Sequence, residues 1–279
     1  MPIRPLRLVR KMRGGAQAHL LACDDGHFYV VKFLNNPQHR RILANEWIAA
    51  VFLEYLNISA PAVEIVDVSP EFLAANPDVH FQLGNRRIAV DPGWHFGSRY
   101  PGDPAKLAVY DFLPDPLLDK VANQADFLGA LVFDKWMGNA DARQSIFFRA
   151  RLRDWLPDPS EHPLKAGFLT QIIDNGFVFS GPEWTLADSP LLGLYFRRQV
   201  YSHVRSLADF DPWLQRIVEF PLSVVDRARR GIPPQWIDGD EDSLDELLDR
   251  LMRRRRRVPD LIAASAADRK NPFPAWGRP

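Results

Sequence analysis

The sequence predicts an α+β protein with two lobes, in which a β-rich N-terminal lobe containing one key helix precedes a mostly helical C-terminal lobe. Three observations predict this order. Short apolar segments separated by tight turns fill residues 6–33, apolar residues at helical spacing follow in residues 40–56, and helical patterns dominate after residue 190. We expect the N-terminal lobe to span residues 1–92 and the C-terminal lobe to span residues 93–279.

The composition indicates a soluble globular protein in a reducing compartment. The 279 residues are 46% hydrophobic and 25% charged, and 35 Lys and Arg balance 35 Asp and Glu, so no net charge favours nucleic acid or a membrane surface. The single cysteine, Cys23, excludes a disulfide framework and cannot form a zinc site by itself. The N-terminus lacks the apolar region of a signal peptide, and no apolar run is long enough to span a membrane. We therefore expect a cytoplasmic protein with no membrane partner.

The first 33 residues have the pattern of an antiparallel meander. Three strand-like segments are expected, at residues 6–9, 18–23 and 27–33. Gly14-Gly15 separates the first two, and Asp24-Asp25-Gly26 is a strong hairpin turn between the second and the third. Lys32 lies at the end of the third strand, where a lysine is most often solvated, so its position alone indicates no function.

A helix is predicted for residues 40–56, because apolar residues recur there on one stripe: Ile42, Ala49, Leu53 and Leu56. Glu46 lies in the middle of this stripe. A carboxylate on an apolar face needs a partner, since burying it alone is costly, and Lys32 is a candidate for that partner. Further strands are predicted at residues 61–66 and 87–90, and residues 91–118 have the composition of a loop.

The second half of the chain begins with a helix predicted over residues 123–137, which Gly138-Asn139 ends. Asp141 follows this helix after a short loop. Two short strands are predicted at residues 145–149 and 168–173, and Asp174-Asn175-Gly176 follows the second. Later helices are predicted at residues 211–218 and 224–230, and Ser243 with Glu246 forms the pattern of a capping box for a helix that contains Leu244, Leu247, Leu248 and Leu251.

Five features in this order are the kinds of parts that phosphoryl transfer from ATP requires: the Gly14-Gly15 pair, Lys32, Glu46, Asp141 and Asp174. Backbone amides of a glycine loop hold phosphates, and a lysine paired with a glutamate contacts them. One carboxylate orients or deprotonates the acceptor hydroxyl, and another holds magnesium. Each residue also has a structural interpretation, as a turn, a solvated lysine or a cap. The ordered set favours the functional interpretation.

The same segments resemble the HipA-like protein kinases. The phosphate loop of that family is similar to Gly14-Gly15-Ala16-Gln17, its lysine strand to Tyr29-Val30-Val31-Lys32, and its glutamate helix to Asn45-Glu46-Trp47. Its catalytic loop is similar to residues 136–141, and its magnesium-binding strand resembles Ile172-Ile173-Asp174. The resemblance covers residues 10–180 and implies a protein-kinase-like two-lobed fold.

The resemblance implies a role for each matching residue. It assigns Gly14, Gly15, Ala16, Gln17, Lys32 and Glu46 to the ATP site, Asp141 to catalysis and Asp174 to magnesium. The chain departs from the family after Asp141, because the HipA toxins carry a histidine and then a metal-binding asparagine where this chain reads Ala142-Arg143-Gln144-Ser145. We favour Gln144 as the replacement metal ligand, with Ser145 as the alternative, since magnesium accepts amide and hydroxyl oxygens. We expect the chain to lack the extra N-terminal subdomain of the HipA toxins and to form a stand-alone, divergent kinase core.

We therefore expect a phosphotransferase that uses Mg-ATP (ATP with Mg2+) and acts as a serine/threonine kinase on a protein acceptor. The family resemblance also suggests an antitoxin-like partner. Two alternatives remain open: a pseudokinase that binds nucleotide or docks partners, and an enzyme of the same fold that transfers AMP. A third idea, nucleic-acid binding by residues 253–257, is less favoured, because arginines at the end of a helix also interact well with the helix dipole.

Overall fold

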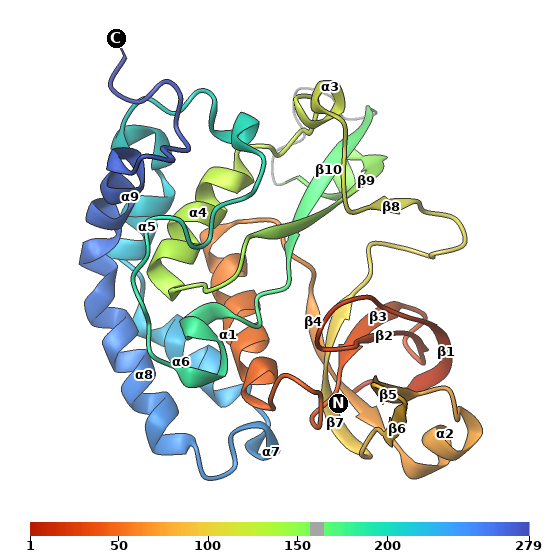
Figure 1. Cartoon of the computed structure of the whole chain (residues 1–279). Helices are drawn as coiled ribbons and strands as arrows, with labels where there is room; N and C mark the ends of the chain where they lie inside the picture. Colours follow the sequence, from red (N-terminus) through yellow and green to blue (C-terminus); the bar gives the residue numbers. More distant parts are fainter. Residues whose placement is uncertain (157–164, 279) are drawn as a thin grey trace.

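The computed structural model describes residues 1–156 and 165–278, and their arrangement forms two lobes (Figure 1). The N-terminal lobe is built on a five-stranded sheet in the order β1-β2-β3-β7-β4, in which all neighbours are antiparallel. Its strands are β1 (Pro5–Lys11), β2 (His19–Cys23), β3 (Phe28–Lys32), β7 (Gly93–Arg99) and β4 (Val63–Val68). The meander predicted from the first 33 residues is confirmed.

A smaller hairpin and a short helix complete the N-terminal lobe. The hairpin consists of β5 (His80–Leu83) and β6 (Arg86–Ala89), and the short helix is α2 (Pro70–Ala75). One face of the large sheet packs on this hairpin and helix through a separate apolar core: Leu21, Tyr29, Val31, Phe33, Val66, Phe72 and Phe81. Tyr29, Val31 and Phe33 are buried together there, as their alternation in the sequence predicts.

The C-terminal lobe combines helices with a three-stranded sheet in the order β10-β9-β8. The strands are β8 (Val109–Tyr110), β9 (Gln144–Arg151) and β10 (Ala166–Ile173). The helices are α3 (Asp115–Leu118), α4 (Asp126–Met137), α5 (Trp213–Val218), α6 (Leu222–Arg230), α7 (Pro234–Ile237), α8 (Glu241–Arg254) and α9 (Val258–Ala267). In Figure 1, α8 and α9 form the outer edge of this lobe, and α4 lies on their inner side.

Helix α1 (Arg41–Leu56) belongs to both lobes. Its position between the N-terminal sheet and the C-terminal helices is visible in Figure 1. Phe52 packs in the core of the helical lobe, where its ring centroid lies 5.3 Å from that of Trp136 and 4.7 Å from that of Phe220. The helix predicted from the apolar stripe is therefore confirmed, and its packing fixes Glu46 between the lobes.

Two sequence-based predictions are wrong in detail. Residues 93–99 were expected in a loop but form β7, which lies between β3 and β4, so the N-terminal sheet extends past residue 92. A Cβ atom at Gly97 would lie 2.5 Å from Cγ2 of Val66, which explains a glycine inside this strand. The capping box at Ser243 is also absent, because α8 begins at Glu241 and Asp240 is its first flanking residue.

Candidate active site

The centre of the candidate active site is the ammonium group of Lys32. It comes from the end of β3 and contacts Oε1 of Glu46 on α1 and Oδ1 of Asp174 after β10, the latter at 2.6 Å. Lys32 is 9% exposed and Glu46 is 4% exposed, so this pair is shielded from solvent. Burial alone would lower the pKa of Lys32, but the two carboxylates outweigh it and raise the pKa above its usual value.

Asp174 lies at the solvent-accessible side of this cluster, since its side chain is 38% exposed. The charge of Lys32 holds the pKa of Asp174 below its usual value, against the opposing effect of burial. The backbone of Asp174 has φ 58°, a left-handed conformation that turns the chain sharply at the end of β10. A Cβ atom at Gly176 would lie 2.6 Å from Cγ2 of Ile42. The loop after Asp174 thus approaches α1 as closely as a glycine permits.

Asn45 fixes this loop to α1. Its side chain is fully buried, and Nδ2 donates to the carbonyl oxygens of Gly176, Val178 and Gly181 at 2.7, 3.2 and 3.1 Å. Its Oδ1 accepts a hydrogen bond from Nε1 of Trp184 at 2.8 Å. The asparagine that precedes Glu46 in the sequence therefore holds the loop that carries Asp174.

Gln144 is the second candidate metal ligand, and the structure places it beside the first. It begins β9 opposite Ile173, and its Nε2 donates to Oδ2 of Asp174 at 3.0 Å. Ser145 points to the other face of the strand and is 5% exposed. Of the two alternatives for a neutral oxygen ligand, only Gln144 contacts Asp174.

These donors fit a hard divalent cation that is shared with a nucleotide. Asp174 provides a carboxylate, and the amide of Gln144, whose nitrogen faces Asp174 here, would present its oxygen to a cation after rotation of the amide group. Magnesium in nucleotide sites is commonly bound by one or two carboxylates plus phosphate oxygens. Among residues 1–156 and 165–278, no group of three or more His, Cys, Asp or Glu side chains is arranged to hold a metal ion by itself. A cation at this position would need further ligands besides Asp174 and Gln144.

Asp141 lies on the loop that follows α4. Gly138 ends the helix with φ 60°, and the N–H of Ala140 donates to the carbonyl oxygen of Phe177 at 2.9 Å, which joins this loop to the loop after Asp174. Asp141 is exposed, and its Oδ1 accepts from the N–H of Ala142 at 2.7 Å. Within the described chain it has no hydrogen bond or ion pair to Lys32, so it stands apart from the charged cluster.

Arg143, which in the sequence marks only a departure from the family pattern, is a structural part of the site. It is 2% exposed and forms a bidentate ion pair with Asp134 of α4, with Nε to Oδ2 at 2.8 Å. The same guanidinium donates to the carbonyl oxygen of Ile173 and to Oδ1 of Asn175, at 2.9 and 2.8 Å. Arg143 thus links the loop of Asp141 to both neighbours of Asp174. Asp134, a carboxylate that follows the apolar run at residues 130–133 of α4, is the signal in the sequence that points to such a pair.

The glycine loop closes the hairpin between β1 and β2. Gly14 has φ 116°, and the N–H of Gln17 donates to its carbonyl oxygen at 3.1 Å. Gly15 is exposed, whereas Ala16 is buried. The side chain of Gln17 binds the backbone of Gln82 on β5, with Nε2 to O at 2.8 Å and Oε1 from N at 2.7 Å. The expected phosphate contacts are therefore left to the backbone of this loop.

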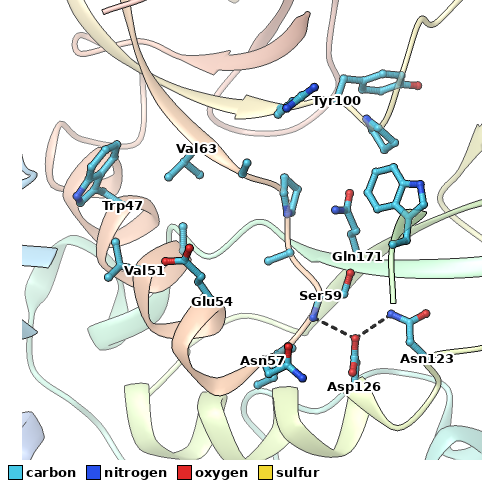
Figure 2. A pocket seen from close by; sticks show the side chains of 18 of the residues that line it. Trp47, Val51, Glu54, Asn57, Ser59, Val63, Tyr100, Asn123, Asp126 and Gln171 are labelled. Atoms are coloured by element: carbon cyan, nitrogen blue, oxygen red, sulfur yellow. Dashed lines mark hydrogen bonds between the residues drawn. The ribbon is translucent and has the colours of Figure 1, made fainter. Parts of the chain in front are cut away.

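A separate cavity of about 950 Å³ lies between the lobes on another face of α1 (Figure 2). Its lining includes Trp47 and Val51 of α1, and Oδ2 of Asp126 at its base accepts hydrogen bonds from Ser59 N and Asn123 Nδ2 at 3.0 and 2.8 Å. No residue of the expected ATP site lines this cavity. It is therefore distinct from the cluster around Lys32.

Comparison with known proteins gives a family and a fold. The family model described as HipA-like kinase matches residues 6–147. A crystal structure of the Golgi casein kinase with Mn/ADP bound is similar at a TM-score of 0.50 and 12% identity, over 96% of this chain and 74% of that chain. A second structure of the Golgi casein kinase gives a TM-score of 0.53 and 13% identity, over 96% and 73%. At this identity the likeness shows the protein-kinase-like fold alone.

No curated protein sequence matches the chain. In the described residues, no helix has both the length and the apolar composition needed to cross a membrane.

Proposed function

This chain belongs to the HipA-like kinase family, and we propose that it transfers the γ-phosphoryl group of Mg-ATP to a serine or threonine hydroxyl of a protein acceptor. The observation that carries the proposal is the contact of Lys32 with both Glu46 and Asp174. The cluster forms only where β3, α1 and the loop after β10 meet. Burying its charges costs free energy, and apolar side chains would fill the same space without that cost. Phosphoryl transfer uses these three groups.

Lys32 and the glycine loop bind the nucleotide phosphates. Glu46 is buried and holds the ammonium group of Lys32 in place before the nucleotide arrives, so little reorganisation is needed on binding. The backbone N–H groups of residues 14–16 supply further donors, since the N–H of Gln17 bonds to Gly14 and its side chain to Gln82.

Asp174 and Gln144 would hold the divalent cation. When bound, the cation neutralises charge on the phosphate oxygens as the bond to the leaving group breaks. The similar structure of the Golgi casein kinase contains Mn and ADP. By analogy, we propose that this chain also binds a nucleotide together with a divalent cation. We take magnesium as the ion, because it is the usual partner of ATP in kinase sites.

Asp141 acts on the acceptor. The hydroxyl oxygen forms a bond to the γ-phosphorus, the bond between that phosphorus and the bridging oxygen of ADP breaks, and the hydroxyl proton passes to Asp141. The exposure of Asp141 leaves it accessible to a residue on another protein. The contact of its loop with Phe177 keeps it next to the loop of Asp174.

Radiolabel transfer tests the proposal. The full chain is incubated with a soluble protein extract and Mg-ATP labelled at either the γ- or the α-phosphorus, beside Asp141→Asn and Asp174→Asn variants. We expect γ-label on protein serine or threonine with the wild type only. Transfer of α-label would instead indicate an AMP-transferring enzyme. Absence of both labels, with retained ATP binding, would indicate a pseudokinase and would overturn the proposal.

A further inference from the structure

The segment that follows the loop of Asp174 is held against the helical lobe by arginines from the C-terminal helices. Arg254 of α8 is 8% exposed and pairs with Asp188, and its NH1 also donates to the carbonyl oxygen of Leu186 at 3.2 Å. Arg257 donates to the second carboxylate oxygen of Asp188 at 2.8 Å. Two members of the arginine run at residues 253–257 therefore bind an acidic residue of the same chain.

Lys135 of α4 holds the same segment from beneath. It is 3% exposed, and Nζ donates to the carbonyl oxygens of Ser189, Pro190 and Leu192 at 3.0, 2.8 and 2.9 Å. The carbonyl oxygen of Lys135 itself accepts from Nε and NH2 of Arg254, at 3.2 and 3.1 Å. All three N–H donors of the lysine have acceptors, so the buried charge is satisfied.

This segment continues directly into the support of the active site. A Cβ atom at Gly193 would lie 2.4 Å from Cβ of Asp134, so the segment packs closely on α4 at that point. The carbonyl oxygen of Leu194 then accepts from the N–H of Arg143 at 3.2 Å. Arg143 in turn binds Asp134, Ile173 and Asn175. A shift of the segment would therefore move the loops that carry Asp141 and Asp174.

We propose that Asp188, Arg254 and Lys135 are positioning residues that keep the segment at residues 184–195 ordered without phosphorylation. In many kinases the activation loop becomes ordered when one of its residues is phosphorylated and pairs with arginines. Here the genetically encoded carboxylate of Asp188 occupies the role of that phosphate, and Arg254 and Arg257 are its partners. The enzyme is therefore active as translated. The inference rests on the proposed function, because it describes how that site is regulated.

The test compares Asp188→Ala, Asp188→Glu and the wild type as full-length chains. Asp245→Ala serves as the matched control, because Asp245 also lies on the C-terminal lobe and pairs with an arginine, Arg229, at an exposed position. Hydrogen exchange of the backbone in residues 184–195 and the kinetics of γ-phosphoryl transfer are both measured. We expect Asp188→Ala to exchange about tenfold faster and to lose about tenfold in kcat, with little change in KM for ATP, because a hydrogen-bonded charge pair is removed outside the nucleotide site.

Asp188→Glu is expected to recover most of both losses, and Asp245→Ala to show neither. Unchanged exchange and unchanged kcat in Asp188→Ala would overturn the inference. Phosphatase treatment of the wild type is a second check. If it removes phosphate from Thr185 or Ser189 and abolishes the activity at the same time, the inference is also overturned. If the wild type transfers no phosphoryl group, the proposed function fails, and the exchange data still decide whether Asp188 orders the segment.

Discussion

At the scale of single residues, the site depends on one lysine shared by two carboxylates. Glu46 is almost fully buried and Asp174 is partly exposed. Lys32 therefore neutralises the carboxylate of Glu46, which is shielded from solvent, and that of Asp174, which is accessible to a ligand. This division suits a site in which Asp174 must change partners when a cation arrives, while Glu46 keeps its own. The chemistry thus follows from the difference in burial between the two carboxylates.

Replacing the lysine should therefore destabilise the fold as well as remove activity. Lys32→Met leaves Glu46 buried without a counterion, and we expect a loss of about 3 kcal/mol in the free energy of unfolding. Denaturant titration measures this loss. The double variant Lys32→Met/Glu46→Gln should recover part of it, because the unpaired charge is gone. A single variant as stable as the wild type would contradict the interpretation of the pair as buried and mutually dependent.

His95 gives the N-terminal lobe a predictable sensitivity to acid. Its Nδ1 accepts from the N–H of Leu34 at 3.0 Å, so the ring is neutral and its Nε2 donates to the carbonyl oxygen of Asp91 at 3.1 Å. Burial lowers the pKa of His95 to about 4. Because this value lies below the ordinary 6.5, the unfolded chain takes up the proton first as the pH falls. Stability is therefore fully present above pH 6.5 and is lost between pH 6.5 and 4.

The expected loss from this one histidine is about 3 kcal/mol, which is the pKa difference converted at about 1.4 kcal/mol per unit. Thermal denaturation between pH 7 and pH 4 measures it. His95→Asn keeps an acceptor but cannot titrate, so its melting temperature should fall less on acidification than that of the wild type. If the melting temperatures of the two proteins fall equally between pH 7 and pH 4, His95 does not titrate in this way.

At the scale of elements, the site is formed by loops that are tied to one helix. Helix α1 supplies Glu46 to the lysine and Asn45 to the loop after β10, and most of its other buried residues belong to the larger apolar core. The loop of Asp174 is held on its other side by Arg143. Asp174 is therefore positioned by contacts to α1 and to α4, through residues that do not touch a substrate.

Gly176 offers a test of that positioning. Gly176→Ala would place a methyl group 2.6 Å from Cγ2 of Ile42, and we expect the loop to shift and the affinity for nucleotide with magnesium to fall by about tenfold. Fluorescence titration with a labelled ATP analogue measures the change. Adding Ile42→Ala makes room for the methyl group and should restore part of the affinity. Equal affinity in Gly176→Ala and wild type would show that the close contact with α1 is not needed.

The elements also show which features can be read from a sequence. Glu46 was recognisable because a carboxylate interrupted an apolar stripe, and this local signal correctly indicated a charged partner. Asp134 carries a similar signal, because it follows an apolar run, and its partner is the buried Arg143. The sequence-based prediction did not include this pair. Strand β7 was missed because its glycines and polar residues lack alternation, and its burial comes from pairing with two distant strands. The pairing of Asp188 with Arg254 crosses 66 positions, which no local pattern reveals.

At the scale of the whole molecule, the two lobes share a helix. One apolar core contains residues of α1 together with those of α4, α5, α6 and α8, and a second core lies within the N-terminal lobe. The family and the kinase-like fold follow from comparison, and the placement of Lys32, Glu46, Asp174 and Gln144 in one cluster follows from packing. Contacts with α4 and α8 hold the loops on the helical side of the site.

The central claim is that the cluster around Lys32 binds ATP through a divalent cation, and calorimetric titration with the non-hydrolysable analogue AMP-PNP tests it most directly. We expect the wild type to bind the analogue only when magnesium or manganese is present. We also expect at least about tenfold weaker binding by Lys32→Met and Asp174→Asn, since each loses a charged contact. The control Asp245→Ala should bind as the wild type does. Binding that is absent in the wild type, or equal in all four proteins, would contradict the claim.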